Sequence, residues 1–215
     1  LLAREPVCDT PQSAAATASA AQVLGSMGML AQFTLDDTQQ PQQARVLAAL
    51  QAMLNCDSEE VKLAAIEALG RQGAHALPAL HRAFRVVNSP QLEQQLSSAL
   101  AAVGADAVPA LVFQLVRQNA SHSTWRIAGE AIKQIGAPAL PALVQALHAA
   151  NNRPSRGRLL NTLYAIGPDA FVVLMDLAQQ GEIRPDPERL NTIVTPMPDE
   201  IEQARAFAYG GSHVP

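Results

Sequence analysis

Apolar positions recur along this chain in a pattern that repeats about every 31 residues. A glycine followed by a short, mostly apolar run ending in leucine occurs four times, with the glycines at positions 73, 104, 136 and 167, at intervals of 31, 32 and 31 residues. On both sides of each glycine, apolar residues stand three or four positions apart, the spacing of one face of an α-helix. A repeat of this length predicts stacked helical hairpins, each made of a helix A and a helix B.

When the copies are superposed by these intervals, apolar residues fall in the same columns. The helix A columns are Ala65, Leu96, Ala128 and Leu159, then Ala68, Ala99, Ala131 and Thr162, then Leu69, Leu100, Ile132 and Leu163. The helix B columns are Leu77, Val108, Leu140 and Phe171, then Leu80, Leu111, Leu143 and Leu174, then Phe84, Leu115, Leu147 and Ala178. These columns predict a core that successive hairpins share. We expect Gly25 and Gly70 to end the A helices of the first two repeats.

The pattern predicts an all-α fold, an α-solenoid of about five helical hairpins. The predicted divisions are an extended N-terminal arm at 1–12, a degenerate first repeat with an inserted loop at 13–57, and regular repeats at 58–88, 89–119, 120–150 and 151–181. After Gly181 the period stops among several prolines, so 182–215 is expected to form a C-terminal cap or tail. Residues 199 to 209 predict one short helix there, which would cover the exposed end of the array.

The residues from Asp57 to Leu80 carry a pattern that is similar to a known repeat. It reads acidic-x-x-Val-basic-x-x-Ala-x-x-Ala-Leu-Gly-x-x-Gly-x-x-Ala-Leu-Pro-x-Leu. This resembles the short HEAT-like repeats of bacterial scaffolds and phycobilin lyases, over 58–181 well and 13–57 loosely. The resemblance implies an architecture that serves many partners. Deoxyhypusine hydroxylase, a relative with HEAT-like repeats, holds iron with His-Glu pairs, and no histidine of this chain precedes a glutamate.

Composition narrows the function further. The chain has 215 residues, a hydrophobic content of 48 % and a formal net charge of −4, with basic residues scattered along it. Nucleic-acid binding needs a concentrated basic face, so we expect no nucleic-acid partner. No apolar run reaches the eighteen or so residues that cross a bilayer, so we expect no membrane span.

Two cysteines, Cys8 and Cys56, leave two alternatives open. A bridge between them would tie the N-terminal arm to the array and would need an oxidising compartment, whereas unpaired thiols fit a reducing cytosol. The start at Leu1, without methionine, fits either a removed leader or a truncated chain. Together these features favour a periplasmic or other extracytoplasmic location over a cytoplasmic one.

In HEAT-type arrays the B helices line the concave face, and helix B positions outside the core would face a partner. We predict a partner-binding face at His81, Val112, Phe113, Val116, Val144, His148 and Met175. Its centre is apolar, which suits an amphipathic helix or an extended peptide, although curvature or the C-terminal segment would also bury such residues. A second contact, for an acidic partner, is predicted at Arg153, Arg156 and Arg158, where a solvated edge is the simpler interpretation.

No catalytic or metal-binding residue and no cofactor is predicted. Nucleophile elbows and phosphate-binding loops are absent from the sequence, and His81 and His148 differ in register, so they are not expected to share an ion. The sequence therefore favours a non-enzymatic scaffold or adaptor in a larger protein assembly. The alternative is a chromophore-lyase-type or other small-molecule-handling HEAT-like protein, although its aromatic residues are few for a tetrapyrrole cavity.

Overall fold

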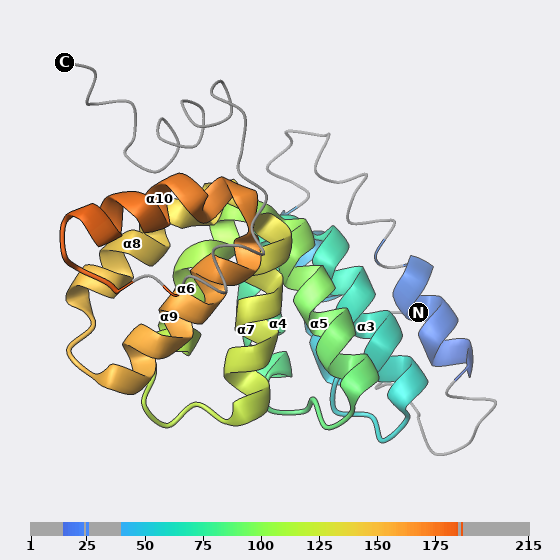
Figure 1. The fold of residues 1–215 in the computed structure, drawn as a ribbon. Helices are drawn as coiled ribbons and strands as arrows, with labels where there is room; N and C mark the ends of the chain where they lie inside the picture. The colour runs from blue at the N-terminus through green and yellow to red at the C-terminus, as the bar shows by residue number, and fades with distance from the viewer. Residues whose placement is uncertain (1–14, 24, 26–39, 185, 187–215) are drawn as a thin grey trace. The chain divides into compact units, whose positions relative to one another are not determined.

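The computed structural model describes residues 15–23, 25, 40–184 and 186, and at 40–43 it describes the backbone only. Every regular element within these residues is a helix, so the predicted all-α fold is confirmed for the described part of the chain (Figure 1). The chain divides into two units, Leu1–Ala107 and Val108–Pro215. The predicted arm at 1–12 and residues 187–215 of the predicted cap lie outside the described residues.

Unit 1 contains a helix at residues 15–23 and 25, followed by four further helices. These are α2 (Gln40–Met53), α3 (Glu59–Arg71), α4 (Leu77–Ala83) and α5 (Pro90–Val103), with 3₁₀ turns η2 (Gly73–Ala76) and η3 (Gly104–Ala107). Helix α3 packs against α2, α4 and α5, and α3 and α5 lie side by side (Figure 1). The A helices of two consecutive predicted repeats, α3 and α5, are therefore direct neighbours.

Unit 2 continues with the same alternation of elements. Its helices are α6 (Val108–Val116), α7 (His122–Ile135), α8 (Leu140–Ala149), α9 (Arg153–Ile166) and α10 (Pro168–Gln179), with the 3₁₀ turn η4 (Ala137–Ala139) before α8. Helix α9 packs against α6, α7, α8 and α10, and α6 also packs against α7 and α8. Within this unit, consecutive A helices, α7 and α9, again contact each other.

The predicted core columns are almost entirely buried. All twelve helix A positions of these columns are buried, including the polar Thr162 at 5 % exposure. In helix B the column Leu80, Leu111, Leu143 and Leu174 has no member above 1 % exposure. Only four of the twelve helix B positions, Leu77, Phe84, Phe171 and Ala178, are half-buried. The periodicity therefore identified the core correctly, because in a packed helix the face that recurs every three or four residues is the face removed from water.

Glycine recurs in the repeat because the backbone requires it. Gly104, Gly136 and Gly167 have φ of 79°, 73° and 86° with ψ of −143°, −137° and −136°. Side-chain-bearing residues almost never adopt this conformation, whereas glycine does so readily. Each of these glycines ends a helix A and redirects the chain into helix B, which explains the constant interval between the copies.

The expected role of Gly70 is wrong, because α3 continues past it to Arg71. Gly25 is helical, and the residues that follow it lie outside the described part of the chain, so its role as a helix end stays a prediction. A Cβ atom on Gly70 would lie 3.0 Å from the Cα of Ala99 in α5, and one on Gly25 would lie 2.9 Å from the Cβ of Ala68 in α3. Glycine stands at these positions because the helices approach too closely for a side chain, a tertiary cause that the local sequence does not reveal.

Polar caps mark the start of the later A helices. The side chains of Ser89, Ser121 and Asn152 accept hydrogen bonds from the backbone N–H groups of Leu92, Thr124 and Ser155, at 3.3, 3.1 and 2.9 Å. These residues stand 32 and 31 positions apart, so the caps follow the same period as the glycines. Ser58, in the equivalent place before α3, makes no such bond. The caps fix where each helix A begins by satisfying its exposed N–H groups.

One stretch, Pro90–Val116, is long and apolar enough to cross a membrane by length and composition alone. Its chain is not one regular helix, because Gly104 and the turn η3 separate α5 from α6. Leu92, Leu96 and Leu100 of α5 are at most 2 % exposed. A core helix of this composition passes the same test, so the stretch is weak evidence for a membrane span.

Candidate functional site

Six of the seven residues predicted to face a partner lie in unit 2, on three B helices. Val112, Phe113 and Val116 are on α6, Val144 and His148 on α8, and Met175 on α10. Helices α6 and α8 are in contact, so the structure brings the first two groups onto neighbouring elements. The seventh residue, His81, is on α4 in unit 1, where its ring contacts that of Phe84 edge-on at 5.9 Å between centroids.

Phe113 is the most exposed member of the apolar set. Its exposed fraction is 57 %, and the only other large apolar side chain as exposed among the described residues is Val23. The cause lies in the helix register, because Val108, Leu111 and Leu115 of α6 point into the core and leave Phe113 on the opposite side. Val112 and Val116 are half-buried and stand one position before and three positions after it. We call Val112, Phe113 and Val116 the α6 patch.

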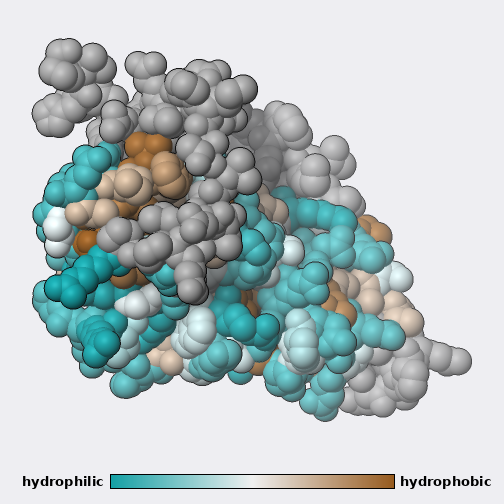
Figure 2. All heavy atoms as spheres, viewed as in Figure 1, coloured by the Kyte–Doolittle hydropathy of each residue, from teal (hydrophilic) through white to brown (hydrophobic). Residues whose placement is uncertain are grey.

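The rest of the predicted face is less uniform. Val144 is only 7 % exposed, so the expectation that it meets a partner is corrected: it joins the wide buried face of α8 that Leu140, Leu143 and Leu147 form. Met175 is half-buried and His148 is exposed. Figure 2 shows apolar side chains gathered over α10 at the upper left, whereas most other visible described surface is hydrophilic. Among the predicted residues the one exposed apolar side chain is thus Phe113 of α6, and Val112, Val116 and Met175 are half-buried.

Two of the three clustered arginines hold the unit together internally. Arg156 donates from Nη1 to the carbonyl of Leu147 at 3.0 Å, and Arg158 donates from Nη1 to the carbonyl of Arg117 at 3.1 Å. Ser155 adds a bond from its hydroxyl to the carbonyl of Val116 at 2.8 Å. These donors satisfy carbonyls at the ends of α6 and α8, where the helix leaves them without partners. Arg153, the third member, is exposed.

The chain after α10 runs back along α9. Arg156 donates from Nη2 to the carbonyl of Glu182 at 2.9 Å, and the Tyr164 hydroxyl accepts from the backbone N–H of Asp186 at 3.0 Å. Ile183 between them is 7 % exposed. Because Arg156 lies in the first turn of α9 and Tyr164 near its end, residues 182–184 and 186 follow the direction of that helix. This is how the described part of the predicted C-terminal cap lies, and we call it the return segment.

Replacing Arg156 by alanine is expected to destabilise unit 2 and to loosen the return segment. The variant loses two charge-assisted hydrogen bonds to carbonyls, and because the side chain is 30 % exposed the net cost is expected near 1–2 kcal/mol, about the lower end for such bonds. Thermal unfolding and amide hydrogen exchange at Glu182 to Arg184 would measure it. Arg153→Ala is the matched control on the same helix turn; an equal loss in both variants would contradict the internal role of Arg156.

Neither metal nor catalytic chemistry gains support from the described residues. Within them, no group of three or more histidine, cysteine, aspartate or glutamate side chains lies close enough to hold a metal ion. His122 contacts Trp125 edge-on, with 4.6 Å between ring centroids, on the exposed first turn of α7.

Cys56 lies in the turn between α2 and α3 and is 7 % exposed. It is disulfide-bonded, and the sequence holds one other cysteine, Cys8. Cys8 lies outside the described residues, so the pairing stays a prediction. The mass of the intact protein before and after reduction and alkylation would test it.

The comparisons with known proteins give no family for this chain. No family model matches it, and no curated protein does. Among solved structures, one match is a crystal structure of an engineered protein from the Northeast Structural Genomics Consortium, at 16 % sequence identity. The match covers 94 % of this chain and 92 % of that one, with a TM-score of 0.44. A likeness at that score assigns neither a fold nor a function.

Proposed function

We propose that this protein is a non-enzymatic scaffold or adaptor that binds another protein through the α6 patch. The observation that carries the proposal is the side chain of Phe113, which is 57 % exposed on a short helix whose other large side chains are buried or half-buried. Folding gains nothing from leaving an aromatic ring in water, and exposed aromatic rings are enriched where proteins bind each other. Partner binding would bury this ring.

The chemistry of the patch indicates the kind of partner. Val112 and Val116, one helical turn apart, and Phe113 beside them form a short apolar strip, and Gln145 and His148 of the neighbouring α8 are exposed polar residues. An amphipathic helix or an extended peptide with one or two apolar anchors would fit an apolar strip with a polar border. The affinity would then depend strongly on the one aromatic ring, as is usual for a binding hot spot.

We also propose the larger arrangement that this function would use, in which HEAT-like hairpins stack into an α-solenoid. The burial of equivalent columns and the direct packing of consecutive A helices within each unit support it. Stacked hairpins give extended surfaces without a closed active-site cavity, which suits a docking role. An extracytoplasmic location is proposed as well, on the strength of the disulfide at Cys56.

Replacing Phe113 by aspartate is expected to lower partner recovery at least tenfold while leaving the fold intact. The ring contributes contact area that a charge cannot replace, and a hot-spot residue is worth about 2 kcal/mol or more. The measurement is capture of a partner by photo-crosslinking from positions 112 and 116, compared between the native chain and the variant. Circular dichroism would verify the helical content.

The chain offers a matched control in Gln145, an exposed residue that stands at the position of Phe113 in the next repeat. Gln145→Asp adds the same charge at the equivalent place on α8, and because Gln145 lies only in the polar border, we expect it to lower recovery far less than Phe113→Asp does. If both variants captured the same partner as well as the native chain, the α6 patch would not be the docking surface. Phe113→Leu, which keeps an apolar side chain, should retain most of the binding.

A further inference from the structure

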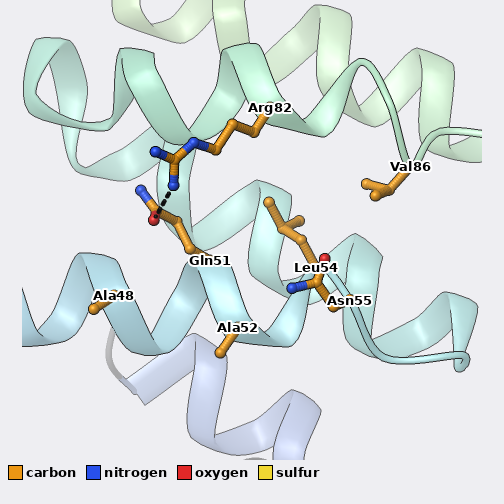
Figure 3. A pocket seen from close by; sticks show the side chains of 7 residues that line it. All are labelled: Ala48, Gln51, Ala52, Leu54, Asn55, Arg82 and Val86. Carbon is orange, nitrogen blue, oxygen red and sulfur yellow. Dashed lines mark hydrogen bonds between the residues drawn. The ribbon is translucent and has the colours of Figure 1, made fainter.

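A hollow of about 290 Å³ opens on unit 1, whereas the α6 patch belongs to unit 2. It lies between the C-terminal half of α2 and the end of α4, and Figure 3 shows the side chains around it. The residues that line it are Ala48, Gln51, Ala52, Leu54, Asn55, Arg82 and Val86. The hollow exists because α2 presents alanines at positions 48 and 52, one turn apart, where larger side chains would fill the space.

Arg82 is the one charged side chain in this lining. It reaches from α4 toward α2, where Nη1 donates to the side-chain oxygen of Gln51 at 3.0 Å (Figure 3). A guanidinium group has five N–H donors in a rigid fork, and a neutral amide oxygen takes only one of them here. The lining contains no aspartate or glutamate, so its charge is positive. An anion that accepts two parallel bonds is the ligand that such a fork fits best.

The rest of the lining is small and mostly apolar. Ala48, Ala52, Leu54 and Val86 supply methyl and methylene groups, and Asn55 adds one amide at the turn that follows α2. A ligand that matches both the Arg82 guanidinium and the apolar lining carries a charged group and, next to it, a few apolar carbons. Phosphate or sulfate would fit the arginine but would leave the apolar part of the hollow unused.

We propose that this hollow binds a carboxylate attached to a short apolar chain. The carboxylate takes the free donors of the Arg82 guanidinium, displacing or sharing the contact with Gln51, and the apolar chain lies over the alanines at 48 and 52 of α2. The same chemistry is found in a free short-chain carboxylic acid and in the C-terminus of a peptide that ends in an apolar residue. The site is independent of the α6 patch and of the function proposed for it.

The test is a titration of the ¹⁵N-labelled full chain, followed by the NMR signals of the Arg82 Nε–H and the Asn55 amide. Three probes are used: butyrate, acetyl-Ala-Ala-Val with a free carboxylate, and the same peptide with its C-terminus amidated. A hollow that holds a few ligand atoms predicts dissociation constants of about 1 mM. We expect the free-acid peptide or butyrate to shift both signals and the amidated peptide to shift neither. Stronger binding of the free-acid peptide would indicate a peptide terminus, and equal or stronger binding of butyrate a free acid.

Variants on the same helices make the test specific. Arg82→Gln should weaken binding at least tenfold, whereas Arg85→Gln removes the same charge from the turn after α4, outside the lining, and should leave binding unchanged. Gln51→Ala removes the residue that competes for the guanidinium and should tighten binding. Circular dichroism verifies that each variant folds. If Arg82→Gln does not fold, the tighter binding expected of Gln51→Ala still tests the site. The proposal is overturned if no probe shifts these signals up to about 20 mM, if the amidated peptide binds equally well, or if Arg82→Gln and Arg85→Gln behave alike.

Discussion

Truncating Leu143 to alanine is expected to lower the free energy of unfolding of unit 2 by about 3 kcal/mol, in the middle of the range for fully buried leucines. Leu143 is 0 % exposed and stands on α8, which packs against α6 and α9. Its removal leaves a cavity in the buried core of unit 2, to which Leu111 and Leu174 also belong. Denaturant unfolding followed by the fluorescence of Trp125, the single tryptophan, would measure the loss.

The control for this prediction is Gln145→Ala on the same helix. Gln145 is exposed, so its truncation should change the stability by less than about 0.5 kcal/mol. Equal effects of the two substitutions would contradict the assignment of Leu143 to the core. Leu80→Ala, in unit 1, extends the experiment: if the two units share one stacked core, as the proposed solenoid requires, this variant will also shift the transition that Trp125 reports.

Replacing Gly70 by valine is the second substitution with a large expected effect, a loss of about 2–3 kcal/mol. A Cβ at this position would lie 3.0 Å from both the Cα and the Cβ of Ala99, so α3 and α5 would have to move apart. The branched methyl groups add to the overlap and outweigh the small gain in helix propensity over glycine. Thermal and denaturant unfolding followed by circular dichroism would measure the change.

Gly157→Ala also adds a side chain to a glycine inside a helix, but it is expected to raise the stability. Gly157 lies inside α9, and a Cβ there would meet nothing within 4 Å. Alanine is favoured over glycine in a helix by about 0.8–1 kcal/mol, so this variant is expected to be more stable than the native chain. A destabilised Gly157→Ala or an unaffected Gly70→Val would show that the close approach of α3 to α5 is not what selects glycine.

The fold class and the core could be predicted because both depend on a local rule repeated many times. A helix buries every third or fourth residue, so a column such as Leu80, Leu111, Leu143 and Leu174 identifies the core even in a single sequence. The glycines at 104, 136 and 167 were identifiable for the same reason, since a turn that needs positive φ selects glycine each time. Phe113 was placed outside the core by its register alone.

The tertiary structure decided the roles of residues whose burial or contacts depend on other helices. Val144 belongs to the predicted face by register, yet it is buried, because a helix with neighbours on two sides has a wider core face than one column suggests. Arg156 and Arg158 read as a surface cluster, but they bind carbonyls 9 and 41 residues away. The hollow beside Arg82 joins residues of α2 and α4 that no motif connects.

The sequence by itself thus determined the all-α class that the described residues confirm and most of the side chains that leave water, because these follow from helix periodicity and from the backbone needs of glycine. Only the three-dimensional arrangement decided the role of Gly70, the internal use of the arginines and the hollow at Arg82. Each of these depends on how closely two different helices approach, and residue spacing within one helix carries no information about such a distance.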